Sequence, residues 1–105
     1  MAHDPKTALT NTSEAELSAL LEQSDLIADT DDMHDDMYDW ESVAYGQPKN
    51  ALPGLPANTA LSFFQADIVT KEIVIAIAER PGTNEPYVAW AGSPEHAAKA
   101  FLPAA

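Results

Sequence analysis

One stretch of this 105-residue chain decides its fold: Glu72-Ile73-Val74-Ile75-Ala76-Ile77-Ala78-Glu79. Its β-branched side chains favour extended backbone. Successive side chains of a strand point to opposite faces, so an isoleucine face and a valine–alanine face would both be apolar. Because such strands are covered on both sides, the sequence predicts a central strand between two packed layers.

The residues after this strand predict a β-hairpin and a closing helix. A turn rich in proline and glycine over residues 80–86 separates the strand from a second short strand over 87–90. A helix is then predicted to begin after Ser93, which can cap it, with Pro94 at its first position and Glu95 in its first turn, as at many helix N-termini. A strand face that this helix leaves uncovered could support a homodimer. The predicted buried face of the helix comprises Ala97, Ala98, Phe101 and Leu102.

The segment before the central strand allows two structures. Residues 59–70 could form a short helix capped by Asn58 or Thr59, or a third strand over 61–66. We favour the helix, because apolar residues recur there at helical spacing. Further upstream, residues 46–58 contain two glycines and three prolines, which predict an ordered loop between the two halves of the chain.

Residues 13–45 predict an acidic helical hairpin. Ser13 and Glu16 have the spacing of a capping box, so a first helix is expected over 14–23. Thr30 can cap a second helix, which the glycine and proline after residue 45 would end. The apolar stripe of this second helix is predicted to consist of Met33, Met37, Trp40 and Ala44.

The predicted fold class is α+β in a single small domain, because a chain of this length supports one hydrophobic core. Residues 1–12 are polar and aperiodic, and we expect a flexible N-terminus there. Residues 13–105 then hold the acidic helical hairpin, the Pro/Gly loop and a neutral α/β half over 59–105. That half is expected to contain a small antiparallel β-hairpin or sheet and the C-terminal helix.

The negative charge is concentrated in about a quarter of the chain. Residues 14–41 contain eleven of the seventeen carboxylates and no lysine or arginine, whereas the net charge of the whole chain is −12. Localised acidity creates a field that attracts basic surfaces and repels nucleic acids and anionic membranes. The sequence therefore predicts a basic protein partner, such as a nucleic-acid-binding protein or complex, and no direct binding to nucleic acid or membrane.

Four aspartates would form a ridge along the second predicted helix, at positions i, i+3, i+4 and i+7 from Asp32. Like charges so spaced cost about 0.2–0.5 kcal/mol per pair, so an uncompensated ridge indicates a functional face, with a merely solvated face as the alternative. Four helical residues rise about 6 Å, which is comparable with the spacing of phosphates along a DNA strand. The candidate partner-binding residues are Asp25, Asp29, Asp31, Asp32, Asp35, Asp36, Tyr38, Asp39 and Glu41.

The run Asp29-Thr30-Asp31-Asp32-Met33-His34-Asp35 resembles the acidic helix of the overcome-classical-restriction family. The members of that family are small phage proteins that mimic DNA and block restriction enzymes. The resemblance implies a DNA-mimic inhibitor of the broader class of small acidic phage proteins, which includes many anti-CRISPR proteins. It implies action in the host cytoplasm and specifies no target.

Motifs for catalysis or metal binding are missing from the sequence. There is no cysteine and no Gly-x-Ser-x-Gly motif, and His34 has acidic neighbours at a spacing that matches no established metal motif. We therefore expect no cofactor and a non-enzymatic inhibitor. The start of the chain lacks the pattern of a signal peptide, so we expect a cytoplasmic protein. The alternative function is an immunity protein, antitoxin or secretion chaperone with one cognate basic partner.

Overall fold

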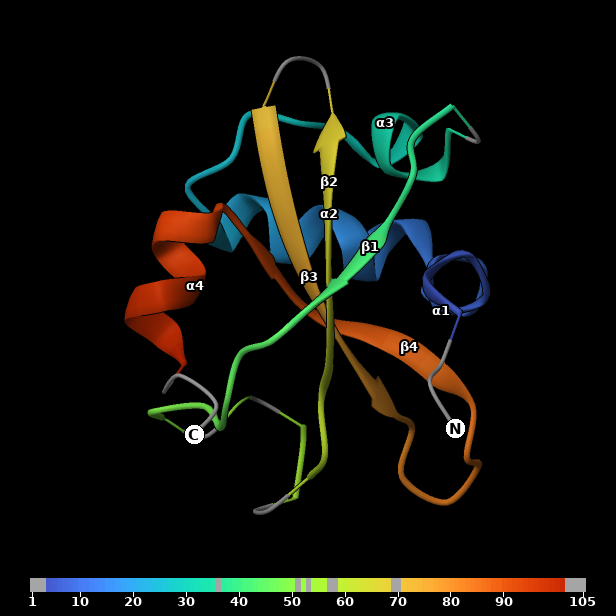
Figure 1. The fold of residues 1–105 in the computed structure, drawn as a ribbon. Helices are drawn as coiled ribbons and strands as arrows, with labels where there is room; N and C mark the ends of the chain where they lie inside the picture. The colour runs from blue at the N-terminus through green and yellow to red at the C-terminus, as the bar shows by residue number, and fades with distance from the viewer. Residues whose placement is uncertain are drawn as a thin grey trace.

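A computed structural model shows an α+β fold in which one antiparallel sheet separates two helical layers of unequal size (Figure 1). The strand order is β1-β2-β3-β4, so each strand lies beside its neighbour in the sequence. The predicted fold class is therefore confirmed. The structure describes residues 4–35, 37–50, 52, 54–56, 59–68 and 71–101.

Strand β3, Lys71–Glu79, is the central strand that the sequence predicted. Its six middle residues are all buried, because helices pack on both of its faces. It pairs with β2 (Ser62–Ile68) on one side and β4 (Pro86–Gly92) on the other, which confirms the predicted hairpin. Strand β1 (Glu41–Val43) completes the sheet beyond β2.

Two hydrophobic cores lie on the two faces of the sheet. The larger core joins the isoleucines of β3 to three helices: α1 (Pro5–Asn11), α2 (Glu14–Gln23) and α3 (Thr30–His34). The smaller core joins the valine and an alanine of β3 to α4 (Pro94–Ala100) and to Phe101, which follows it. The alternation of isoleucine with valine or alanine in β3 thus assigns the bulkier face to the larger core.

Two helices begin at the residues that the sequence predicted. Helix α2 carries both bonds of the capping box: Ser13 Oγ accepts the N–H of Glu16 at 3.1 Å, and Glu16 Oε1 accepts the N–H of Ser13 at 3.1 Å. Ser93 Oγ accepts the N–H of His96 at 3.1 Å at the start of α4. Both caps satisfy backbone donors that the first helical turn leaves without partners.

The predicted buried face of α4 is correct in part. Ala97 is fully buried, and the ring of Phe101 packs edge-on against Trp90 with centroids 4.9 Å apart. Ala98 is exposed, so this part of the prediction is wrong, and Leu102 lies outside the described residues. A short helix presents only a narrow stripe of side chains to the sheet, so Ala98, the neighbour of Ala97, lies outside this stripe and faces solvent.

The second predicted helix is wrong beyond its first turn, and no acidic helical hairpin forms. Helix α3 ends at His34, and Asp35 has extended backbone with φ −70° and ψ 127°. The predicted apolar stripe is broken, because Met33 is buried whereas Met37 is 85% exposed. Residues 41–43 form β1 instead. Repeated aspartates weaken a helix, and pairing with β2 satisfies the backbone groups that a longer helix would have satisfied.

Strand β2 replaces the helix that we favoured for residues 59–70, so that prediction is also wrong. Phe63 is buried in the smaller core and Phe64 in the larger one. Neighbours on a helix are only about 100° apart, whereas neighbours on a strand point to opposite faces and can fill both cores. Pairing of β2 with β3 along its full length therefore decides the conformation of this segment.

The N-terminal segment forms helix α1, and the flexible N-terminus predicted for it is wrong for the described residues. Asp4 Oδ1 accepts the N–H of Lys6 at 3.1 Å, and Pro5 is the first helical residue. Ala8 and Leu9 are buried in the larger core. A capping side chain followed by a proline begins both α1 and α4, and the start of α1 was overlooked because the segment is otherwise polar.

Candidate interaction surface

The aspartate ridge predicted for the second helix does not exist in this form. Asp32 belongs to α3, Asp35 follows its end, and Asp39 lies in non-helical chain before β1. Asp36 lies outside the described residues. Because helical geometry stops at His34, the i, i+3, i+4, i+7 alignment and its match to the spacing of DNA phosphates are both wrong.

Three of the predicted site residues around α3 support the local backbone. Asp29 Oδ1 accepts the N–H of Asp32 at 2.9 Å, and Asp32 Oδ2 accepts the N–H of Asp29 at 3.4 Å, which is a reciprocal capping box. Asp35 Oδ1 accepts the N–H of Met37 at 2.9 Å. These carboxylates shape the turn as N-caps and turn acceptors do, whereas Asp31 is an exposed acid of α3.

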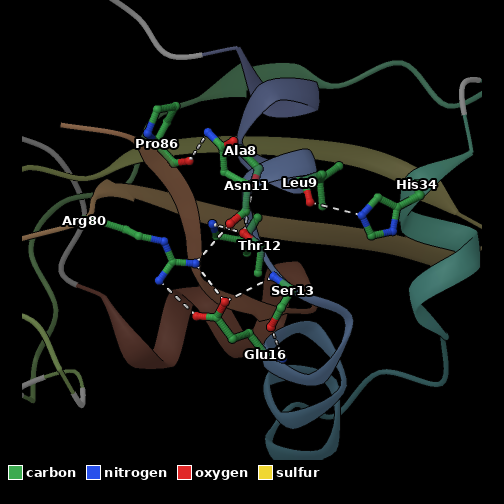
Figure 2. A network of polar contacts seen from close by, with 10 residues as sticks. Ala8, Leu9, Asn11, Thr12, Ser13, Glu16, His34, Arg80 and Pro86 are labelled. Carbon is green, nitrogen blue, oxygen red and sulfur yellow. Dashed lines mark hydrogen bonds and ion pairs between the residues drawn. The ribbon is translucent and has the colours of Figure 1, made fainter. Parts of the chain in front are cut away.

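His34 connects α3 to α1. Its Nδ1 lies 2.8 Å from the carbonyl oxygen of Thr30. Its Nε2 lies 3.0 Å from the carbonyl oxygen of Leu9, as Figure 2 shows. Both ring nitrogens are thus directed at backbone oxygens, and neither is directed at the neighbouring carboxylates. The histidine that the sequence placed among acids serves the packing of two helices.

The structure brings other predicted site residues together beside β1. Tyr38, Asp39 and Glu41 line an open hollow of about 480 Å³, to which β2 and β3 contribute two further acids, Asp67 and Glu72. We call the four carboxylates of this site the acidic hollow: Asp39, Glu41, Asp67 and Glu72. Exposed Met37 and half-buried Tyr38 also line it.

The sheet register explains how two acids from the supposedly neutral half reach this place. Asp67 lies directly opposite Glu72, and Gln65 lies opposite Glu41. By strand alternation, Gln65 and Asp67 share the face of Phe63, which belongs to the core beneath α4. Helix α4 covers the Phe63 end of that face and leaves the acidic end open (Figure 1). Sequence reasoning missed Asp67 because it assigned residues 59–70 to a helix, and it missed Glu72 because no strand was then expected beside it.

The acidic hollow carries charge that the fold does not neutralise. Directly opposed like charges such as Asp67 and Glu72 destabilise a sheet. Arg80 pairs with Glu16 and Lys99 with Glu95, and between described residues no ion pair reaches the hollow. A local arrangement that opposes stability without compensation is typical of a functional surface.

Glu16, in contrast, is fully engaged in the structure. Its Oε1 lies 2.7 Å and its Oε2 3.1 Å from the guanidinium of Arg80, which also donates to the carbonyl oxygen of Asn11 at 3.0 Å (Figure 2). The bonds from Arg80, with those from Ser13, lower the pKa of Glu16 from 4.5 to about 2. The guanidinium lies over the ring of Tyr87, 4.2 Å from its centroid. This network joins α2 to the β3–β4 turn and has a structural role.

Asp25 lies apart from the acidic hollow and holds α4. Its Oδ2 accepts the hydroxyl of Ser93 at 2.7 Å, its Oδ1 accepts the N–H of Ser93 at 3.2 Å, and Nδ1 of His96 lies 3.5 Å from Oδ1. The bonds from Ser93 lower the pKa of Asp25. A hydrolytic triad requires the serine hydroxyl to face the histidine. Here the hydroxyl donates to the carboxylate, so the three residues form a tether.

Within the described ranges, no group of three or more histidine and acidic side chains is arranged to hold a metal ion. In the same part of the chain, no helix has the length and apolar character needed to cross a membrane. Comparison of this chain with protein-family models, with curated proteins and with solved structures finds no match.

Proposed function

We propose that this chain is a non-enzymatic acidic binding protein that occupies a basic, nucleic-acid-binding surface of another protein. The observation that carries the proposal is the acidic hollow, where Asp39, Glu41, Asp67 and Glu72 meet on one open face without a neutralising base among the described residues. An inhibitor of the anti-restriction or anti-CRISPR kind would act in this way, through charge complementarity and steric exclusion.

A basic partner would relieve the repulsion within the acidic hollow. Lysine and arginine side chains would be drawn to it over several ångströms of solvent, which raises the association rate and makes binding weaken with salt. Met37, with 85% of its surface exposed, and Tyr38 lie at the same place and supply apolar contact area. Aromatic residues and methionine are enriched where protein interfaces bury their centres.

The test compares two charge-neutralised variants in affinity capture from host lysate at low salt, with duplex DNA as competitor. The hollow variant carries Asp39→Asn, Glu41→Gln, Asp67→Asn and Glu72→Gln. The control variant loses the same number of charges at exposed positions elsewhere: Glu14→Gln, Glu22→Gln, Glu85→Gln and Glu95→Gln. Because both variants have the same net charge, a difference between them reports the location of the acids.

We expect wild type and control to retain a nucleic-acid-binding protein that duplex DNA displaces, and the hollow variant to bind it at least about tenfold more weakly. Equal retention by the hollow variant would contradict the proposal. A single retained partner that DNA does not displace would instead support an immunity protein, antitoxin or chaperone.

A further inference from the structure

The two edges of the sheet are treated differently by the fold. At the β4 edge, Thr12 Oγ1 accepts the N–H of Val88 at 2.8 Å, and the Asn11 side chain donates to the carbonyl oxygen of Pro86 at 3.0 Å (Figure 2). Thr12 is 3% exposed, so this cover is built into the core. The occupied groups of Pro86 and Val88 cannot pair with another strand.

The β1 edge lacks such a cover among the described residues. The alternating direction of backbone N–H and C=O groups along the strands identifies which residue of β1 has these groups free to pair. The N–H of Val88 points away from β3, so its partner Ile77 directs its own backbone groups toward β2. Along the continuous β2–β3 register, pairs that exchange backbone hydrogen bonds alternate with pairs that do not, so the N–H and C=O of Phe64 point toward β3 and away from β1. Ser42, which lies opposite Phe64, therefore directs its N–H and C=O away from the sheet. Ser42 is exposed, and no hydrogen bond to these two groups is formed in the described structure.

The charge beside this edge selects the kind of strand that would pair with it. Glu41 is the neighbour of Ser42, and its side chain shares the α4 face with Asp67 and Glu72. A strand added to β1 would place every second side chain on that face, next to Glu41, with Asp67 on β2 and Glu72 on β3 further into the sheet. Lysine or arginine at those positions would be attracted. A second copy of this chain paired antiparallel about Ser42 would instead place Glu41 of both copies on one face as diagonal neighbours, and these like charges would repel each other.

We propose that β1 is a docking edge for an extended segment of the partner with a basic residue at every second position. This inference rests on the proposed function and adds the way in which the partner segment binds. Backbone hydrogen bonds to Ser42 supply the attachment, and the acidic hollow supplies the preference for basic side chains. Short edge strands are often blocked by lysine or proline. This one carries neither, although α1 covers the opposite edge.

The test uses a short peptide of alternating lysine and valine, labelled for fluorescence anisotropy, with the full chain. The variant Ser42→Pro removes the outward N–H without changing the charge, and proline is tolerated on an edge strand when its nitrogen faces solvent. Ser42→Ala is the matched control, because it keeps the N–H. A second peptide with N-methylated valines keeps every lysine and loses the donors that would face β1, so the test does not depend on the folding of the proline variant.

We expect wild type and Ser42→Ala to bind the first peptide equally, and Ser42→Pro or N-methylation to weaken binding about tenfold. Equal binding of both peptides by the wild type would overturn the docking edge. That result would leave the proposed function standing, because the latter is tested separately, by whether the hollow variant keeps its partner and whether duplex DNA displaces that partner. Sedimentation that shows a wild-type dimer abolished by Ser42→Pro would assign the edge to a second copy and also overturn the inference.

Discussion

The two acidic regions of this molecule differ in what the fold does with their carboxylates. Glu16 on α2 is paired with Arg80 and caps its own helix, whereas the acidic hollow gathers Asp39, Glu41, Asp67 and Glu72 without an opposite charge from the described residues. In the first region the charge stabilises the fold through an ion pair, whereas in the second region the repulsion between like charges lowers stability. Acidity in a sequence therefore needs to be separated into charge used within the fold and charge available to a partner.

The largest effect on this comparison is expected from Arg80→Ala. This change removes the ion pair to Glu16, the bond to the Asn11 carbonyl and the contact with the Tyr87 ring. We expect the free energy of unfolding to fall by about 1–2 kcal/mol, measured by urea denaturation. Lys71→Ala, at an exposed basic residue of β3, is the control and should change it by less than about 0.5 kcal/mol. Equal losses from both variants would remove the distinction between the two regions.

The pH dependence of stability sharpens the same contrast. The pKa of Glu16 is lowered from 4.5 to about 2, so the folded state favours the ionised carboxylate. Its contribution is fully present above about pH 4.5 and is lost as the pH falls toward 2. Because the side chain is 41% exposed, we expect a contribution of about 1 kcal/mol. The free energies of unfolding of wild type and Glu16→Gln, measured with urea across this pH range, should converge at its acidic end. A difference that stays constant with pH would contradict this prediction.

Neutralising the acidic hollow should have the smallest effect on stability, with the opposite sign. The hollow variant removes repulsion between Asp67 and Glu72, which lie directly opposite each other. We expect the free energy of unfolding to rise by about 0.5 kcal/mol, measured by urea denaturation beside the control variant. A clear loss of stability would show that these acids support the fold and would weaken their assignment to a partner.

Sequence reasoning succeeded where a structure is specified within a few neighbouring residues. The capping box of Ser13 and Glu16 and the Ser93 cap are local hydrogen-bonding patterns, and both helices begin where they predicted. The central strand was predicted because its composition suits extended backbone on both faces. The start of α1 at Asp4 was equally local, and only the polarity of the surrounding residues concealed it.

Sequence reasoning failed where two conformations were locally comparable. The methionine and tryptophan spacing after Thr30 suits a helix, but the chain leaves the helix after His34 and pairs with β2. Residues 61–66 suit either structure, and β3 determined the outcome by offering an unpaired edge. Of the predicted site, Asp39 and Glu41 meet in the hollow with Tyr38, whereas others cap α3 or hold α4.

The sequence by itself determined the charge imbalance, the central strand and the starts of two helices, because these depend on composition and on short-range hydrogen bonds. The tertiary structure alone decided that Asp67 and Glu72 join Asp39 and Glu41, and that Ser42 faces outward from the sheet. Both follow from strand register, which pairs residues distant in sequence and reverses every side chain if it shifts by one position.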